Sequence, residues 1–310
     1  MPLTIKDIET AHLRIRQYVH NTSVVTSDLL DELTGCRLFF KCEHLQKAGA
    51  FKSRGAVNAV LSLSDVEASK GVATHSSGNH GAALARAARI RNIPAYVVVP
   101  GNARQAKKDA MRSYGAELIE CESTLTARQE MLTRVVRDTG AAIVHPYDDD
   151  RVIAGQGTTA LELFDQVVDL DAVIVPVGGG GLLAGCAIVA YPKVHVYGAE
   201  PEMADDAHRS FNGGDLITHH VPKTICDGLQ TTLGQRNFEI IQHKVTDILL
   251  VSEKEIVDAM SLLWTRLKQV VEPSSAVTLA AVIRNRNVFQ GQRLGLILTG
   301  GNVDLNDLPF

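Results

Sequence analysis

Residues 176–185 read PVGGGGLLAG, in which four consecutive glycines separate a β-branched run from a run of small helix-forming residues. This order predicts a strand over Ala172–Val177, then a tight turn and a helix. Successive glycines can turn backbone N–H groups toward an anion, and the start of a helix attracts negative charge. A flexible turn is the simpler interpretation, but it needs only one or two glycines. The stretch therefore predicts a phosphate-binding loop, and without GxGxxG or GK[ST] the phosphate is expected to belong to another cofactor than a nucleotide.

Short apolar runs alternate with amphipathic stretches along the rest of the chain. The expected strands read GVATHSS, AYVVVP, AELIEC, AAIVHP, AVIVPV, VHVYGAE, DILLVS and LGLILTG. The stretches GNHGAALARAARIRN, ARQAKKDAMRSYG and TARQEMLTRVVRDTG place apolar residues three and four apart and end in or near Gly or Asn, as helices do. This alternation predicts an α/β fold with mostly parallel sheets and helices on both faces. No linker is present, so a second domain is expected to form by insertion.

Composition favours a globular protein that acts on small molecules. The chain has 310 residues, 45% hydrophobic and 21% charged, and a net charge of −4 without any dense Lys/Arg block, so neither nucleic acid nor an anionic membrane is an expected partner. Five cysteines without a CxxC pair indicate neither a disulfide framework nor a zinc site, which fits the cytoplasm. The amino terminus does not read as a secretory signal. Residues 172–191 lack charge, but the proline and glycines inside favour strand, turn and helix over a membrane span.

Two other loops carry polar groups after apolar runs. THSSGNHGAAL, at residues 74–84, gathers hydroxyls, an amide and an imidazole that could bind a carboxylate or simply cap a helix. KAGAFKSRGA, at residues 47–56, places Lys52 at the expected start of a helix. On its own, such a lysine is most often a solvated surface charge.

The motifs FKSRGA, SSGNHG, GGGGLLAG, EPSSAV and LTGGN, in this order over nearly the whole chain, resemble the fold type II pyridoxal-phosphate enzymes. Within that class they are similar to the group of serine racemases and serine/threonine dehydratases, which includes 3-hydroxyaspartate dehydratases. The resemblance implies two α/β domains of the tryptophan synthase β kind, with the cofactor in the cleft between them. The large domain would comprise residues 1–69 and 149–310, the small inserted domain residues 70–148, and the protein is expected to be a homodimer.

The resemblance also implies how this sequence holds pyridoxal 5'-phosphate. Lys52 would form the Schiff base and, once freed by the substrate amine, would take the Cα proton. Thr299 would face the pyridine nitrogen, and a neutral partner there favours β-elimination over a long-lived carbanion. The other cofactor contacts would be Phe51 beside the ring, Asn79 at the ring hydroxyl, and Gly178, Gly179, Gly180, Gly181 and Leu182 at the phosphate.

The same resemblance implies the substrate site and its product. Ser76, Asn79 and His80 would bind the α-carboxylate of the substrate. The substrate would be L-serine, L-threonine or 3-hydroxyaspartate, and the products would be a 2-oxo acid and ammonia. Ser77, where threonine dehydratases commonly carry alanine, could exchange a proton on the face opposite the lysine, as racemisation requires, or could cap a helix. Arg128 could pair with a second carboxylate of the substrate, although a surface helix arginine is the commoner interpretation.

The segment AEPEMADDA, at residues 199–207, matches the divalent-cation site of metal-activated serine racemases. Glu200, Asp206 and the Ala204 carbonyl form an all-oxygen set that suits Mg²⁺, Mn²⁺ or Ca²⁺. A solvated acidic loop is the simpler alternative.

Some positions depart from the racemase pattern. Tyr147 in HPYDDD stands where the mammalian-type enzymes carry Asn, and it is more similar to bacterial and fungal dehydratases, which leaves the substrate open. Ala82 replaces a Gln that helps to bind nucleotide, so ATP activation is not expected, although Tyr114, Arg266 and Lys268 match that site. A β-replacement enzyme of the cysteine or threonine synthase kind remains an alternative, and so does an inactive binding protein, against which the lysine beside intact loops argues.

Overall fold

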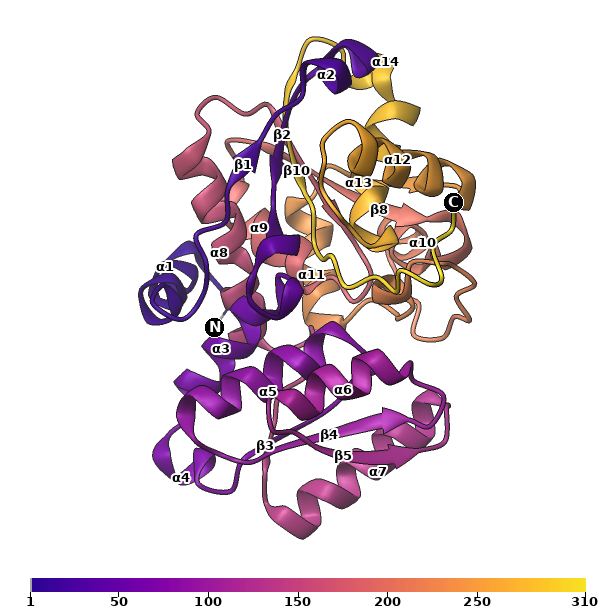
Figure 1. Cartoon of the computed structure of the whole chain (residues 1–310). Coiled ribbons are helices and arrows are strands. Elements are labelled where there is room, and N and C mark those ends of the chain that lie inside the picture. Colours follow the sequence, from indigo (N-terminus) through magenta and orange to yellow (C-terminus); the bar gives the residue numbers. More distant parts are fainter. Residues whose placement is uncertain (1) are drawn as a thin grey trace.

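The computed structural model describes residues 2–310 and contains two sheets (Figure 1). The larger sheet has six strands in the order β1-β2-β10-β7-β8-β9, and all its pairs are parallel except β1 with β2. The smaller sheet has four parallel strands in the order β5-β4-β3-β6. The predicted α/β class with mostly parallel sheets is therefore confirmed. The strands are β1 Val24–Val25, β2 Arg37–Lys41, β3 Val72–His75, β4 Ala95–Pro100, β5 Glu117–Cys121, β6 Ala142–Ile143, β7 Ala172–Pro176, β8 His195–Pro201, β9 Asp247–Val251 and β10 Arg293–Ile297.

Helices cover both faces of the larger sheet. One apolar core joins the sheet to α12 and α13, and a second core joins its opposite face to α1, α8 and α9. In the smaller part of the molecule, α5 and α6 lie between the two sheets, while α7 covers the far face (Figure 1). The helices are α1 Ile5–Ile15, α2 Asp28–Thr34, α3 Lys52–Ser62, α4 Asp65–Ala68, α5 Asn79–Arg91, α6 Gln105–Ser113, α7 Leu125–Thr139, α8 Asp150–Gln166, α9 Gly181–Ala190, α10 Asp206–Gly213, α11 Gln235–Lys244, α12 Glu253–Thr265, α13 Pro273–Arg284 and α14 Arg286–Phe289, with the 3-10 turns η1 Glu43–Leu45, η2 Lys47–Gly49, η3 Glu202–Ala204 and η4 Asp227–Leu229.

All eight expected strands are present, whereas β1 and β2 were not predicted. The smaller sheet lies entirely within residues 72–143. The domain boundaries at 69/70 and 148/149 stay a prediction. The uncharged stretch 172–191 forms β7, the glycine turn and α9, and within residues 2–310 no helix is long and apolar enough to cross a membrane.

A buried ionic cluster fixes the start of α3 to the larger part of the molecule. The Arg54 guanidinium donates through Nε and Nη2 to both carboxylate oxygens of Glu43, each at 2.7 Å. It donates through Nη1 and Nη2 to both oxygens of Glu162, again at 2.7 Å. Lys41 Nζ, at the end of β2, adds a bond of 2.9 Å to Glu162. Two carboxylates thus balance two cations, and α3 is tied to both β2 and α8.

The cluster depends on its own charges because water does not reach it. The side chains of Arg54, Lys41 and Glu43 are fully buried, and that of Glu162 is 4% exposed. Burial alone would raise the pKa of Glu162, but the hydrogen bonds and charges of Arg54 and Lys41 hold this pKa below its usual value. Removing one partner would leave a buried charge without compensation.

We predict that Arg54→Ala lowers the free energy of unfolding by about 3–5 kcal/mol, because two buried carboxylates lose their shared cation. Urea unfolding followed by circular dichroism measures the change. Arg54→Lys, which keeps the charge but loses the bidentate fork, should give an intermediate loss and a usable sample if the alanine variant does not fold. Lys254→Ala is the matched control, because Lys254 pairs with Asp258 at the exposed surface and such pairs are worth under about 1 kcal/mol. Equal stability of the wild type and both Arg54 variants would contradict this account.

Candidate active site

A cavity of about 270 Å³ lies at the carboxyl ends of β3 and β7, where the two sheets face each other. Since ligands of open α/β sheets bind beyond the carboxyl ends of strands, this is the expected place for a site. The cavity is lined by the candidate residues Phe51, Lys52, Ser76, Ser77, Asn79, His80, Arg128, Gly178, Gly179, Gly180, Gly181, Leu182 and Thr299. Residues from distant sequence segments therefore come together, while the acidic segment 199–207 lies outside the cavity lining.

Lys52 is the first residue of α3, and its amino group points toward the loop that follows β6. Lys52 Nζ donates to the Pro146 carbonyl at 2.9 Å and lies 5.1 Å from the centre of the Phe51 ring. Burial lowers the pKa of Lys52 to about 8, and the charge of Glu272 opposes the shift. A lysine with this pKa is far more often unprotonated near neutral pH than a solvated one.

The glycine loop offers unused backbone donors to the cavity. Among residues 2–310, the amides of Gly178, Gly179 and Gly180 donate no hydrogen bond. Gly180 has a φ of +88°, a left-handed conformation that glycine adopts without strain, and α9 begins at the next residue. Free amides in front of a helix start form a cradle for an anion.

Tyr147 accounts for the requirement for glycine at position 179. A Cβ atom on Gly179 would lie only 2.2 Å from the Tyr147 ring, so the ring packs directly on this backbone. Asn237 Nδ2 joins the two segments by donating to the Gly179 carbonyl at 2.6 Å and to the Tyr147 carbonyl at 3.1 Å. The shape of the glycine loop is thus set by contacts with residues distant in sequence.

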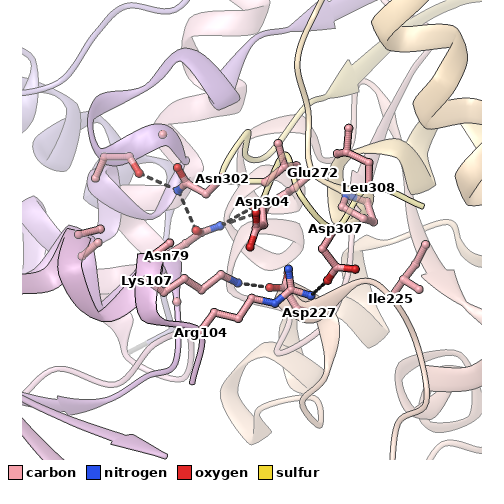
Figure 2. A pocket seen from close by; sticks show the side chains of 18 of the residues that line it. Asn79, Arg104, Lys107, Ile225, Asp227, Glu272, Asn302, Asp304, Asp307 and Leu308 are labelled. Carbon is pink, nitrogen blue, oxygen red and sulfur yellow. Dashed lines mark hydrogen bonds and ion pairs between the residues drawn. The ribbon is translucent and has the colours of Figure 1, made fainter. Parts of the chain in front are cut away.

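Asn79 is held in one orientation by two partners. Its Nδ2 donates to Glu272 Oε1 at 2.9 Å and Oε2 at 3.2 Å, while its Oδ1 accepts from Asn302 Nδ2 at 2.9 Å (Figure 2). Burial, together with the charge of Asp227, raises the pKa of Glu272 to about 7. Glu272 stands in the motif EPSSAV but was not predicted as a site residue. The signal that could have indicated it is a carboxylate directly before the start of the largely apolar helix α13.

The loop before α5 divides the tasks of its two serines. Ser76 Oγ accepts hydrogen bonds from the Gly78 and Gly81 amides at 3.3 and 3.0 Å and so caps the helix. Ser77 is exposed to the cavity, and its hydroxyl has no hydrogen-bond partner among the described residues. The simpler interpretation of Ser77, that it caps the helix, is therefore wrong. His80 is buried behind the loop, where Nε2 faces the Val144 carbonyl at 3.2 Å and burial holds its pKa well below the usual value.

Thr299 presents a neutral hydroxyl to the cavity. Its Oγ1 lies 3.1 Å from Ser275 Oγ, on α13, and its carbonyl accepts from the Phe51 amide at 3.0 Å. The second contact fixes the residue that precedes Lys52.

Arg128, on α7, is half-buried at the cavity wall and forms no ion pair with a described carboxylate. Burial, together with the charges of His145 and Arg128, lowers the pKa of His75 to about 4. The guanidinium therefore reaches the cavity with its charge available for a ligand.

The acidic segment forms a separate buried pair. Glu200 accepts from the Ala207 and His208 amides at 3.1 and 2.8 Å, and Asp206 Oδ2 accepts from the Leu233 amide at 2.8 Å. Asp206 Oδ1 is buried without a partner. Burial raises the pKa of Asp206 to about 6, and burial with the charge of Asp206 raises that of Glu200. No cluster of three His, Cys, Asp or Glu side chains suited to a metal is found within residues 2–310.

Figure 2 shows a larger cavity of about 720 Å³ that shares Asn79, Lys107, Asp227 and Glu272 with the site. Lys52 is not among its lining residues. Two ion pairs cross it, Lys107 with Asp227 and Arg104 with Asp307, the latter at 2.7 Å. Of the positions considered for a nucleotide, Ala82 and Tyr114 line this cavity, whereas Arg266 and Lys268 do not. Neither ion pair could be predicted from a local pattern, because each joins segments that are far apart in the sequence.

Comparisons with known proteins agree with this geometry. A family model described as "Pyridoxal-phosphate dependent enzyme" matches residues 15–300. A beta-hydroxyaspartate dehydratase of Paracoccus denitrificans is 51% identical, covering 99% of this chain and 98% of that protein. Maize serine racemase has a TM-score of 0.96 at 42% identity, over 99% of this chain and 95% of that one. A threonine deaminase from T.th. has a TM-score of 0.93 at 44% identity, over 98% of this chain and 99% of that one.

Proposed function

The chain belongs to the family of pyridoxal-phosphate dependent enzymes, and from this premise we propose that it removes water from a β-hydroxy amino acid to give a 2-oxo acid and ammonia. One observation carries the proposal. The amino group of Lys52, with a pKa of about 8, lies in a cavity that also contains a glycine loop with free amides and the neutral hydroxyl of Thr299. The dehydratase and deaminase activities of the similar proteins support the same reaction type.

The residues of the cavity fit pyridoxal phosphate. The free amides of the glycine loop, with Leu182, would bind the phosphate, and Lys52 would hold the cofactor covalently. Asn79, already oriented by Glu272, would bind the ring hydroxyl, Phe51 would flank the ring and Thr299 would face its nitrogen. When bound, the cofactor supplies an electron sink for the negative charge that develops at Cα.

Lys52 would be the base that takes the Cα proton. Its lowered pKa keeps part of the amine unprotonated near neutral pH, as a general base requires. The backbone carbonyl of Pro146 receives the resulting ammonium hydrogen at 2.9 Å and so holds the group in place.

The substrate carboxylates would bind at two places. The α-carboxylate would lie on the loop of Ser76, Ser77, Asn79 and His80, at the amino terminus of α5, where backbone dipoles favour an anion. A second carboxylate, as in 3-hydroxyaspartate, would pair with Arg128, whose charge has no acidic partner among the described residues. We therefore propose a dicarboxylic substrate ahead of L-serine and L-threonine.

Ser77 would give the enzyme a racemase capacity. Its hydroxyl lines the same cavity as Lys52 and is not engaged in helix capping, so it can hold or release a proton at Cα from another direction.

Glu200, Asp206 and the Ala204 carbonyl would bind a divalent cation. The unpartnered, buried Oδ1 of Asp206 and the raised pKa of both carboxyls fit an all-oxygen cation site, because a cation would stabilise both charges. As the pair lies outside the cavity lining, the ion would stabilise the fold rather than touch the substrate.

The wider setting is proposed from the sequence. The protein would be a cytoplasmic homodimer that is not activated by ATP. Its five cysteines are all free in the structure, which agrees with a reducing compartment.

Release of a 2-oxo acid from candidate substrates tests the proposed reaction. Purified wild type, incubated with L-serine, L-threonine and 3-hydroxyaspartate, should release a 2-oxo acid with the highest kcat/KM on the dicarboxylate. Arg128→Ala should lower kcat/KM for 3-hydroxyaspartate roughly 10–100-fold, since a charge-assisted pair is lost, and should leave L-serine within about twofold. Lys52→Ala should be inactive on all three substrates. Lys254→Ala is the surface control. Retained activity of Lys52→Ala, or equal loss on every substrate in Arg128→Ala, would overturn the respective assignment.

Loss of the Ser77 hydroxyl should separate racemisation from elimination. Ser77→Ala should stop conversion of L-serine to D-serine and elimination from D-serine, while elimination from L-serine, which relies on Lys52, continues. Chiral chromatography and 2-oxo acid release measure the activities. Retained racemisation would show that another group serves the second face, and a wild type without racemisation would remove this role from Ser77.

The proposed cation site should make stability depend on pH and on Mg²⁺. Because the folded-state pKa of Asp206, about 6, exceeds its ordinary 3.8, the protonated carboxyl favours folding. In EDTA this contribution is present below about pH 4 and lost as pH rises through 6, a decrease of about 3 kcal/mol at most. Mg²⁺ at a hundredfold excess over its Kd should restore about 3 kcal/mol at pH 7.5.

Thermal unfolding from pH 4 to pH 8 with EDTA or Mg²⁺ provides the measurement. Asp206→Asn should show a smaller pH dependence and no response to Mg²⁺. Asp258→Asn, at an exposed site, should behave as wild type. An equal Mg²⁺ response in Asp206→Asn would refute the site.

A further inference from the structure

Tyr147 occupies the wall of the active-site cavity without a role so far in the reaction. It lies in the loop between β6 and α8, where its ring packs on the backbone of Gly179. Its hydroxyl oxygen is 2.8 Å from the Thr231 hydroxyl oxygen, and Thr231 lines the same cavity. Ring and hydroxyl are therefore fixed by separate contacts.

Tyr147 carries a hydroxyl proton that it can donate. Burial raises the pKa of Tyr147, against the opposing effect of the Thr231 hydrogen bond, so the phenol is protonated at neutral pH. Either hydroxyl can donate in the pair. When Thr231 donates, the hydrogen on Tyr147 is free to reach a ligand.

Tyr147 lines the same cavity as the base Lys52. Lys52 Nζ is bonded to the carbonyl of Pro146, the residue directly before Tyr147. Ser76 Oγ is occupied by the helix cap. His145 Nδ1 accepts from the Asp148 and Tyr147 amides at 2.9 and 3.4 Å, which fixes the backbone of this loop. The proton acceptor, Lys52, and the proton donor, Tyr147, therefore belong to two segments that are in contact through the Pro146 carbonyl.

We propose that the Tyr147 hydroxyl protonates the leaving β-oxygen of the substrate. This role rests on the proposed elimination. Lys52 takes the Cα proton, and the electron pair of that C–H bond forms the Cα–Cβ double bond. The Cβ–O bond breaks with its electron pair on oxygen, which receives the Tyr147 proton and departs as water. The tyrosinate then recovers the proton that Lys52 took, directly or through water, so both residues return to their starting state.

Varying the leaving group tests this role. Tyr147→Phe keeps the ring on Gly179 and removes only the hydroxyl. On L-serine its kcat should fall roughly 10²–10⁴-fold, the usual contribution of general acid catalysis, with KM within about threefold. On β-chloro-L-alanine its kcat should stay within about threefold of wild type, because chloride leaves without a proton. Exchange of the L-serine Cα proton in D₂O, followed by NMR, should also persist.

The controls separate the failure modes. Tyr197→Phe, on β8 and packed against Phe289, should match wild type on both substrates. Pyridoxal phosphate affinity, from fluorescence titration, should be unchanged in Tyr147→Phe. If wild type turns over neither of these substrates nor 3-hydroxyaspartate, the proposed function fails. If wild type is active and Tyr147→Phe dehydrates L-serine normally, or loses both substrates equally, the role of Tyr147 is overturned while the function stands.

Discussion

The double fork of Arg54 onto Glu43 and Glu162 is the interaction on which the site depends. It joins η1 and α3 to the distant helix α8, and its side chains are buried, so water is not at hand to replace a lost partner. Arg54 lies two residues after Lys52, so the cluster that fixes α3 also fixes where the catalytic lysine begins its side chain. The same helix start is held from the other side by the bond from the Phe51 amide to the Thr299 carbonyl. The position of the amine is therefore a property of the folded core rather than of a mobile loop.

Burial then sets the chemistry of the groups in the cavity. It lowers the pKa of Lys52 to about 8 and raises that of Glu272 to about 7, and it keeps His75 and Tyr147 uncharged. Groups with opposite shifts in one cavity are typical of acid–base pairs. The residual field is positive on the wall of Arg128, where no described carboxylate compensates the guanidinium. This charge distribution favours anionic substrates. For this reason the proposed substrate has a second carboxylate, which would bind Arg128.

The sequence predicted what is encoded by contiguous residues. The glycine loop, eight strands and the α/β class follow from runs whose physical meaning is local. Strand β2 was not predicted, because RLFFK begins and ends with charged residues, and Lys41 is buried through partners distant in sequence such as Glu162. The contacts of Glu272 with Asn79, and of Tyr147 with Thr231, join positions 193 and 84 residues apart, so no local pattern could reveal them. The sequence alone does not tell which of the adjacent serines Ser76 and Ser77 caps the helix. The folded backbone assigns this role to Ser76.

Reduction with sodium borohydride followed by peptide mapping tests the central claim, that Lys52 binds the cofactor. The reductant would trap pyridoxal phosphate on the lysine to which it is attached, as a stable secondary amine. The account predicts that the visible absorption band disappears and that one phosphopyridoxyl group is found on the peptide containing Lys52. Labelling of Lys107, the other lysine at the cavity, with Lys52 unmodified would contradict it.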